Sequence, residues 1–310
     1  MKQPIEAILL VNLGTPESYQ RSDVKRYLNE FLSDPLVVDS PRWWWLPVLR
    51  GIILPIRSGA SAALYRSVWL DKGSPLRVYT ESLAHKLRAR TTKKVEWAMR
   101  YGHDNIKNKL NEFKEKGIHR IKVIPLFPQF SRTTIGTVIL EIENYQKNNP
   151  EFFFEVQQGY AQHPEAIAAW ADQLSELRKE NKNHHVLFSF HGLPQRYIRD
   201  GDPYLDECLA TAHAIADKIS LENWSIAFQS QFGPEKWLEP STDEALINLA
   251  EQQRGVIVFA PGFSADCLET LEELDENYRQ LYKAYGGKEW LRVPCLNDSK
   301  KAVQLIGMWV

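Results

Sequence analysis

Two kinds of hydrophobic spacing alternate along the chain, and together they predict an α/β fold. Short runs rich in Val, Ile and Phe have the length of buried strands, and the segments between them repeat apolar residues every three or four positions. This alternation is typical of a parallel sheet covered by helices. The expected strands are 7–13, 95–101, 121–127, 152–159, 185–192, 225–233, 256–262 and 290–296.

The segments between the strands carry recognisable helix ends. In the segment 22–33, Ser22 is a plausible N-cap ahead of an apolar face. The helix that carries Ile106, Leu110 and Phe113 is expected to stop at Gly117, a residue type that suits the position just after a helix. Other apolar stripes lie around Ile167 and within 205–219 and 246–249.

Four strands precede residue 158 and four follow it, so the pattern predicts two similar doubly wound halves. We expect a first domain over residues 1–157 and a second over 158–297. The last helix, within 298–310, is expected to return to the first domain. No low-complexity linker separates the halves.

Composition limits the class of protein. The chain has 310 residues, 44% of them hydrophobic and 25% charged, as in globular proteins, and its formal net charge of −1 gives no indication of nucleic-acid binding. Its cysteines, Cys208, Cys267 and Cys295, form no CxxC pair, which favours a reducing compartment. The N-terminal stretch is interpreted as a first core strand rather than a signal peptide. A cytoplasmic location is therefore expected.

The stretch 41–56, PRWWWLPVLRGIILPI, is the most apolar part of the chain. Pro47, Arg50 and Pro55 interrupt it, and no segment has 18 uninterrupted apolar residues, so no membrane-spanning helix is expected. Either the stretch is a loop that covers the core, or Trp43, Trp44 and Trp45 belong to an exposed lip for a hydrophobic ligand or a membrane surface.

Ligands of open parallel sheets bind beyond the carboxyl ends of the strands. His191 ends the apolar run 185–191 at such a place, although a histidine there can also be purely structural. An imidazole changes protonation near neutral pH, so His191 could accept a proton from a substrate. No GxGxxG or GxxxxGK[ST] motif occurs at any expected strand end, so a nucleotide-phosphate site is not supported.

An acid-rich helix follows the strand 256–262. Asp266 is expected to cap it, and the further acids are Glu269, Glu272, Glu273, Asp275 and Glu276. The like-charged pairs four residues apart each cost a few tenths of a kcal/mol in an ordinary α-helix. We expect Glu272, Asp275 and Glu276 to form a solvated face, and Glu269, one turn into the helix, to point towards the site.

His191 and Glu269 would make an incomplete metal site. A structural zinc takes four protein ligands and a hydrolytic zinc usually takes three, so two ligands suit a metal in transit. The loop 125–138 adds Ser131, Thr133, Thr134 and aromatic rings, and other expected strand ends or turns add Ser74, Arg100 and Tyr101. Hydroxyls, an arginine and aromatic rings suit a flat apolar ligand with carboxylates.

The ordered set of these stretches resembles the ferrochelatase family, the enzymes that insert ferrous iron into protoporphyrin IX to form haem. The matching stretches span nearly the whole chain: LLVNLGTPES, FLSDPLVVD, GSPL, PLFPQFSRTTIGTV, FSFHGLPQRYIRDGDPY, QSQFGPEKWLEPSTDEAL and GFSADCLETLEELD. The resemblance implies two Rossmann-like domains of the class II chelatase type, each with a four-stranded parallel sheet and with the active-site cleft between them.

The resemblance also implies roles for individual residues. His191 and Glu269 correspond to the catalytic, iron-contacting pair, and Glu273 and Glu276 continue an acidic path for metal or protons. The implied substrate-binding residues are Leu13, Ser74, Arg100, Tyr101, Ser131, Thr133 and Trp237. Residues 41–76 correspond to the porphyrin-binding lip, in which Trp43, Trp44 and Trp45 could touch the inner face of the membrane.

The chain departs from the family pattern at three places. Cys267 stands where many relatives have histidine, and Arg132 and Thr133 replace a Cys-Ser pair. There is also no cysteine-rich C-terminal tail, so the iron–sulfur cluster of some relatives lacks its ligands. We therefore expect Fe²⁺ as a substrate, with no cluster and no other permanently bound cofactor.

Other functions remain open at this point. The nearest alternative is a chelatase for coproporphyrin III, or for cobalt and another tetrapyrrole. Coproporphyrin enzymes tend to carry tyrosine where this chain has Leu13, which favours protoporphyrin. A non-catalytic tetrapyrrole or metal-binding protein would not need both His191 and Glu269. A metal-dependent hydrolase would need a third ligand.

Overall fold

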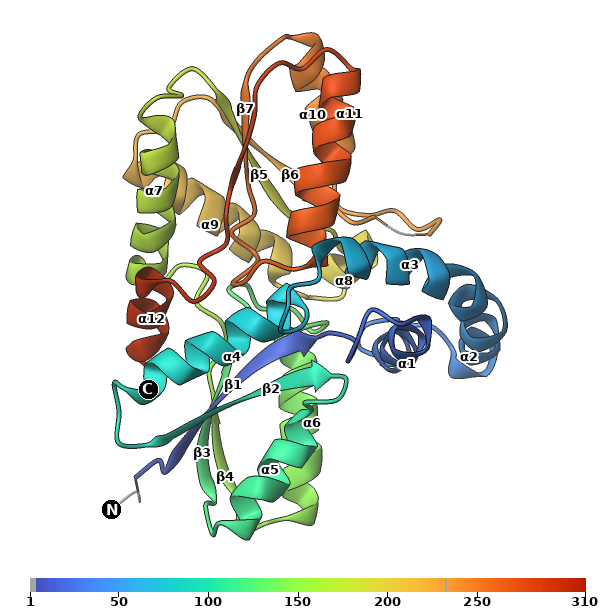
Figure 1. Cartoon of the computed structure of the whole chain (residues 1–310), viewed down its shortest axis with the longest axis vertical. Helices are drawn as coiled ribbons and strands as arrows, with labels where there is room; N and C mark the ends of the chain where they lie inside the picture. The colour runs from blue at the N-terminus through green and yellow to red at the C-terminus, as the bar shows by residue number, and fades with distance from the viewer. Residues whose placement is uncertain (1–3, 232) are drawn as a thin grey trace. The chain divides into compact units, whose positions relative to one another are not determined.

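A computed structural model describes residues 4–231 and 233–310, in which the chain divides into two compact units (Figure 1). The first unit takes the described residues up to Phe127, together with Ser131–Gly159 and Asp298–Val310. The second takes Pro128–Phe130 and Tyr160–Asn297. Pro128–Phe130 lies outside the second domain expected from the sequence. It is held there because the Phe130 amide donates to the Glu207 carboxylate (2.6 Å).

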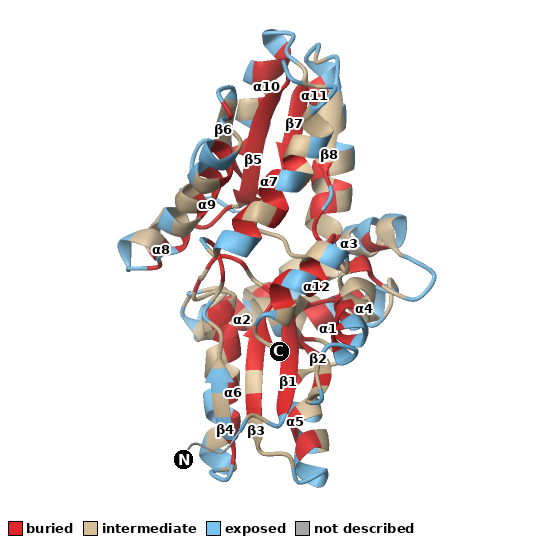
Figure 2. Cartoon of the chain, turned by 90° about the vertical axis from the view of Figure 1, so that its left-hand side faces the viewer, coloured by how far each residue is buried: buried red, intermediate tan, exposed pale blue. Residues whose placement is uncertain are grey.

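The first unit contains a four-stranded parallel sheet in the order β2-β1-β3-β4. Its strands are β1 (Ala7–Gly14), β2 (Lys94–Tyr101), β3 (Arg120–Pro125) and β4 (Phe153–Val156). The central strand β1 is almost wholly buried, as a strand covered on both faces should be (Figure 2). All four strands were predicted from their apolar runs.

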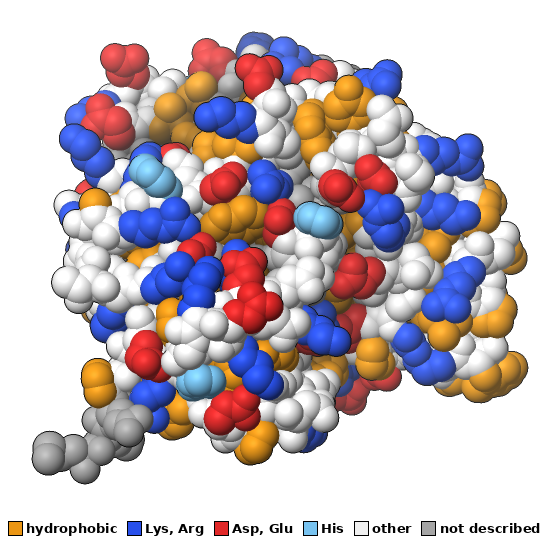
Figure 3. Space-filling model, turned by 60° about the horizontal axis from the view of Figure 1, so that its bottom comes forward, with side chains coloured by type: hydrophobic (Ala, Val, Ile, Leu, Met, Phe, Trp, Pro, Cys, Tyr) orange, Lys and Arg blue, Asp and Glu red, His pale blue; other side chains and the backbone are white. Residues whose placement is uncertain are grey.

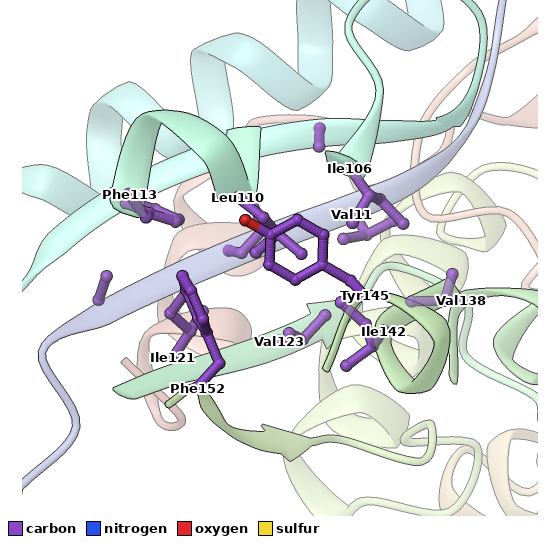
Figure 4. Packing of buried hydrophobic residues seen from close by; sticks show 13 residues of the cluster. Val11, Ile106, Leu110, Phe113, Ile121, Val123, Val138, Ile142, Tyr145 and Phe152 are labelled. Carbon is purple, nitrogen blue, oxygen red and sulfur yellow. The ribbon is translucent and has the colours of Figure 1, made fainter. Parts of the chain in front are cut away.

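Helices α5 (Ile106–Glu115) and α6 (Ile135–Asn148) pack on one face of this sheet around a continuous apolar core, shown in Figure 4. The end of α5 is the predicted one. Gly117 has a φ of +69°, Gly117 N donates to Lys114 O, and Ile118 N donates to Phe113 O (2.9 Å). These two bonds satisfy carbonyls that would otherwise lack donors at the helix end.

Helices α1 (Arg21–Leu32) and α4 (Pro75–Arg88) also belong to this unit, and α12 (Lys300–Gly307) joins α4 as expected. Asp298, just before α12, accepts hydrogen bonds from Ser82 and Lys86 of α4. The predicted cap of α1 was wrong. Ser22 lies inside the helix and Gln20 is the N-cap residue, since Ser18 already accepts from the Gln20 amide and donates to Asp23.

The stretch 41–56, for which the sequence predicted an interrupted apolar run or a loop, is helical. It comprises α2 (Arg42–Val48), the π-helical turn η1 (Leu49–Ile53) and α3 (Leu54–Val68). Pro47 lies inside α2, and Pro55 lies at the start of α3, where a missing N–H costs little. The carbonyl four residues before Pro55, with which its ring would clash in an α-helix, is that of Gly51 in the π turn, where hydrogen bonds join residues five rather than four apart.

The second unit contains a parallel sheet in the order β6-β5-β7-β8. Its strands are β5 (His185–His191), β6 (Trp224–Gln229), β7 (Val256–Phe259) and β8 (Trp290–Val293). Two four-stranded parallel sheets with helices confirm the predicted fold class. The helices and helical turns of this unit are α7 (Pro164–Arg178), α8 (Gln195–Arg199), α9 (Tyr204–Lys218), α10 (Thr242–Glu251), η2 (Glu269–Tyr278) and α11 (Arg279–Ala284).

His185, at the start of β5, makes stability depend on pH. Its ring is buried, Nε2 lies 2.8 Å from Ser225 Oγ, and burial, followed by the nearby charge of Arg254, lowers the pKa of His185 to about 4. Between about pH 6.5 and 4 the unfolded chain therefore takes up a proton that the folded chain does not. We expect the free energy of unfolding to decrease as the pH is lowered through this window. The decrease should be smaller in His185→Gln.

Urea unfolding at pH 7 and pH 5 measures this difference. The matched control is His213→Gln, which replaces an exposed histidine of the same unit and should keep the wild-type loss between the two pH values. An equal loss in wild type and His185→Gln would show that His185 does not carry the effect.

Candidate active site

His191 is the last residue of β5, and a hydrogen bond from its ring to the backbone determines which ring nitrogen carries the hydrogen. Nδ1 lies 2.7 Å from the Gly192 carbonyl oxygen. Because a carbonyl oxygen only accepts, Nδ1 carries the hydrogen, and the neutral ring keeps a lone pair on Nε2. The Tyr204 hydroxyl donates to the His191 carbonyl (3.0 Å) and secures the backbone. His191 is thus oriented to accept a proton or to contact a metal through Nε2.

Glycine is required beside it. A Cβ at Gly192 would lie 2.9 Å from the Gln229 carbonyl oxygen and 3.2 Å from Cε3 of Trp237. The Gly192 amide donates to that same carbonyl (2.7 Å), so the strand continues one residue past His191. Trp237 lies over this turn, and its buried Nε1 has no hydrogen-bond partner in residues 4–231 and 233–310. The indole N–H is therefore a buried donor without a partner among the described residues.

Asp266 was expected to cap the acid-rich helix, but the N-cap residue of η2 is Leu268, and it makes no side-chain cap bond. The buried carboxylate of Asp266 accepts from Arg292 Nη1 (2.8 Å), from Asn297 Nδ2 (2.7 Å) and from the Thr270 hydroxyl (3.0 Å). Removing one partner of such a buried ion pair typically costs about 3–5 kcal/mol. The capping prediction was therefore wrong, because the Asp266 carboxylate is bonded to the side chains of Arg292, Asn297 and Thr270 instead of to the helix backbone.

The helix that follows is a π-helix, η2, and this changes which acids are exposed. The prediction of a solvated face was wrong for Glu272, which is only 9% exposed and accepts from Asn277 Nδ2 (2.8 Å). Burial raises the pKa of Glu272 above its ordinary value. Asp275 lies 3.4 Å from Arg292 Nε. Glu276 is exposed as predicted and pairs with Arg279 (2.6 Å).

Glu273 is the most firmly held acid of η2. It accepts from Gln229 Nε2 (3.2 Å), from the Ser230 amide (2.9 Å) and hydroxyl (2.5 Å), and from the Tyr278 hydroxyl (3.3 Å). Gln229 Nε2 also donates to the Glu269 carbonyl (3.1 Å). Sequence reasoning missed Gln229, the last residue of β6, and Ser230, which follows it, although both belong to one of the stretches that resemble ferrochelatases. Phe232 of that stretch lies outside the described residues.

Cys267 occupies the position of the missing histidine. It is buried, and burial followed by the neighbouring Glu269 charge raises its pKa well above the ordinary value. It is therefore a thiol at neutral pH rather than a metal-binding thiolate. Within the described part of the chain, no group of three or more His, Cys, Asp and Glu side chains could hold a metal ion.

Three candidates of the first unit have their polar atoms bonded within the protein. Ser74 caps α4 by accepting from the Arg77 amide (3.3 Å). Arg100 Nη2 and the Tyr101 hydroxyl both donate to Asp34 Oδ2, at 2.8 and 2.9 Å, and Tyr101 is fully buried. Burial also raises the pKa of Tyr101. These residues build the carboxyl-end face of the first sheet rather than offer free donors.

Ser131 and Thr133 pair with each other, their hydroxyl oxygens lying 2.9 Å apart. Arg132 pairs with Asp39 (3.2 Å), so it occupies the family's cysteine position with a structural ion pair. Leu13 follows Asn12 near the end of β1 and is half-buried. Its backbone amide donates to the Asn12 side chain (2.9 Å).

The three tryptophans divide between core and surface. Trp45 is 7% exposed, packs with Leu49 and Leu54, and donates from Nε1 to the Leu32 carbonyl (2.8 Å). Trp43 is 81% exposed and Trp44 39%. Other large apolar side chains exposed on these helices are Ile52, Ile56 and Leu64. Hydrophobic patches interrupt the mixed charges on the right-hand side of Figure 3, the side on which α2 and α3 lie in Figure 1.

These helices do not cross a bilayer. In residues 4–231 and 233–310, none of the helices combines the length and the hydropathy that a membrane span needs.

The sequence comparisons decide the family. The family model described as Ferrochelatase matches residues 5–310. This chain belongs to the ferrochelatase family. The ferrochelatase of Hamiltonella defensa is 42% identical over 307 residues, covering 96% of each chain. The ferrochelatase of Proteus mirabilis is 41% identical over 307 residues, covering 96% of this chain and 95% of that one. The ferrochelatase of Aliivibrio fischeri is 40% identical over 304 residues, covering 96% of this chain and 94% of that one.

Solved structures support the fold. SirB from Bacillus subtilis with Fe³⁺ matches with a TM-score of 0.60 at 12% identity, covering 98% of this chain and 94% of that one. CbiX, described as the terminal enzyme for biosynthesis of siroheme in denitrifying bacteria, matches with a TM-score of 0.52 at 13% identity, covering 97% and 96%. The fold is thus that of the class II chelatases.

Membership of the ferrochelatase family makes the protein a chelatase of haem biosynthesis, which inserts iron into a porphyrin. The second unit then holds both residues of the predicted pair. His191 ends β5, Glu269 begins η2, and Gln229 of β6 contacts both segments.

Proposed function

We propose that this ferrochelatase inserts Fe²⁺ into protoporphyrin IX, with His191 accepting a pyrrole proton and Glu269 contacting the metal. The observation that carries the proposal is the orientation of His191. Its Nδ1 is committed to the Gly192 carbonyl, which leaves Nε2 as the proton acceptor. The ferrochelatase family supplies the reaction in which such an acceptor is needed.

In the balanced reaction, the porphyrin takes up one Fe²⁺ and releases two protons. A free-base porphyrin carries two N–H groups in the space that the metal takes. Bending the ring turns nitrogen lone pairs outwards, so remote binding energy supplies strain at the reacting centre. Two N–H bonds then break, their electron pairs bind Fe²⁺, and one proton passes to Nε2 of His191. Fe²⁺ is a substrate, and we propose neither an iron–sulfur cluster nor another resident cofactor.

The acids of η2 extend from the half-buried start of the helix to solvent. Glu269 and Glu273 lie about one turn apart, and Glu276 is exposed and paired with Arg279. We assign this series as the path by which the second proton leaves or Fe²⁺ arrives. Because four donors hold Glu273, its carboxylate keeps a fixed position on that path.

Two of the predicted substrate contacts fit direct contact best. The ring of Trp237 lies against the turn after His191, and Leu13 offers an apolar side chain at a strand end. Ser74, Arg100, Tyr101, Ser131 and Thr133 have partners within the protein, so we assign them to the wall that shapes the porphyrin site.

The choice of porphyrin is tested by comparing kcat/KM for anaerobic Fe²⁺ insertion into protoporphyrin IX and coproporphyrin III. The proposal expects protoporphyrin IX to be preferred, because Leu13 replaces the tyrosine typical of coproporphyrin enzymes. A preference for coproporphyrin III, or insertion of Co²⁺ but not Fe²⁺, would support the alternative chelatases. Binding of porphyrin with no metal insertion would leave a tetrapyrrole-binding protein.

We further propose that the protein is cytoplasmic and touches the inner face of the membrane through Trp43, Trp44 and Ile56. These side chains are exposed on one helical segment, and tryptophan is favoured at the membrane–water interface. The contact would place the lip where an apolar porphyrin enters from lipid.

Replacing both Trp43 and Trp44 by Ser should weaken binding to anionic phospholipid vesicles. About 100 Å² of lost apolar contact corresponds to roughly 2.5 kcal/mol, which is more than tenfold in partitioning. Vesicle flotation measures the bound fraction. The control, Tyr285→Ser, removes an exposed ring of the second unit and should bind as wild type does. Equal binding of the double variant and wild type would contradict the membrane contact.

A further inference from the structure

Gln229 is a fully buried residue that joins the two segments carrying the proposed catalytic pair. It is the last residue of β6 and the register partner of His191 on β5. Its carbonyl accepts from Gly192 (2.7 Å), and its side-chain amide donates to the Glu269 carbonyl (3.1 Å). Gln229 therefore connects the turn after His191, through its backbone carbonyl, with the first residue of η2, through its side chain.

The orientation of the Gln229 amide is set by its neighbours. Ser189 donates to Oε1 (2.9 Å), and the Ser189 hydroxyl lies 2.9 Å from that of Thr242. Because Ser189 occupies Oε1, both hydrogens on Nε2 face η2, one towards the Glu269 carbonyl and one towards Glu273 Oε2 (3.2 Å). A flipped amide would place an oxygen against two acceptors.

The bond to Glu269 matters because η2 begins there as a π-helix. The register of a π-helix differs from that of an α-helix, since its bonds join residues five rather than four apart. The carbonyl held by Gln229 belongs to the first π-helical residue. Ser189, Gln229 and Thr242 are all fully buried, so these bonds are shielded from competing water.

We propose that Gln229 is a positioning residue that sets the separation of the His191 ring and the Glu269 carboxylate. It does so through backbone and side-chain bonds and touches neither metal nor porphyrin. This inference rests on the proposed function for the roles of His191 and Glu269. Geometry errors near 1 Å at a reacting centre can cost about 100-fold in rate.

The test compares Gln229→Leu, which removes both donated bonds, with Gln229→Asn, which withdraws the amide by one methylene. The matched control is Ser225→Ala. It lies at the other end of β6 and loses its hydrogen bond to His185 without affecting η2. Near-UV circular dichroism establishes folding, and two readouts follow: kcat and porphyrin KM for metal insertion, and Co²⁺ affinity without porphyrin.

We expect the Gln229 variants to lose about tenfold to 100-fold in kcat with porphyrin KM unchanged, and to bind Co²⁺ at least fivefold more weakly, while Ser225→Ala matches wild type. Folded Gln229 variants with kcat within threefold of wild type would overturn the inference, as would an altered porphyrin KM alone. Failure of the proposed function gives a different result: wild type itself inserts no metal, while the Co²⁺ affinities still report on positioning.

Discussion

His191→Ala is expected to bind protoporphyrin IX with nearly unchanged affinity and to insert Fe²⁺ at least 1000-fold more slowly than wild type. The variant removes the only ring nitrogen that we assign to proton transfer, and a positioned general base contributes about 10²–10⁴-fold. Loss of a metal contact adds to the effect. Stopped-flow absorbance measures insertion, and porphyrin fluorescence measures binding.

Added imidazole provides the control for this variant. It should restore part of the rate in His191→Ala, since a free base can enter the space left by the ring, and should leave wild type unaffected. His213→Gln, at an exposed histidine of the same unit, should insert metal at the wild-type rate. Insertion by His191→Ala within threefold of wild type would remove His191 from the mechanism.

Glu269→Gln is expected to lower kcat for Fe²⁺ insertion by about 100-fold and to raise the KM for Fe²⁺, with porphyrin affinity unchanged. The change keeps the size of the side chain and leaves the hydrogen bond from Gln229 to the backbone carbonyl of residue 269 in place. It removes the negative charge that attracts the metal. Initial rates over a range of Fe²⁺ concentrations separate kcat from KM.

Glu222→Gln serves as the matched control, because Glu222 is an exposed carboxylate of the same unit away from η2. It should leave both constants unchanged. Equal effects of the two substitutions would mean that general electrostatic attraction, rather than a placed carboxylate, explains the role of Glu269.

The strand positions were predictable because buried parallel strands appear in the sequence as short apolar runs. The placement of His191 at the end of β5 followed from the same pattern. Gly117 was predictable for a local reason, since few residue types adopt the positive φ of a helix end. In each case the residues adjacent in the sequence were sufficient for the prediction.

Features that depend on distant residues were not predictable. Glu272 was expected in solvent because α-helical spacing was assumed, and η2 is a π-helix with a different periodicity. Arg292, which lies on β8, forms an ion pair with Asp266. Gln229, at the end of β6, donates a hydrogen bond to the first residue of η2. The helix α2 was missed because Pro47 was taken to break it, whereas the helix continues through Pro47.

The most direct test of the account is an anaerobic crystal structure of the protein with Co²⁺ or Fe²⁺ added without porphyrin. We expect metal density within bonding distance of His191 Nε2 and the Glu269 carboxylate, and its loss in His191→Ala. Density on Cys267 instead, or bound metal that persists unchanged in His191→Ala, would contradict the assignment of this pair.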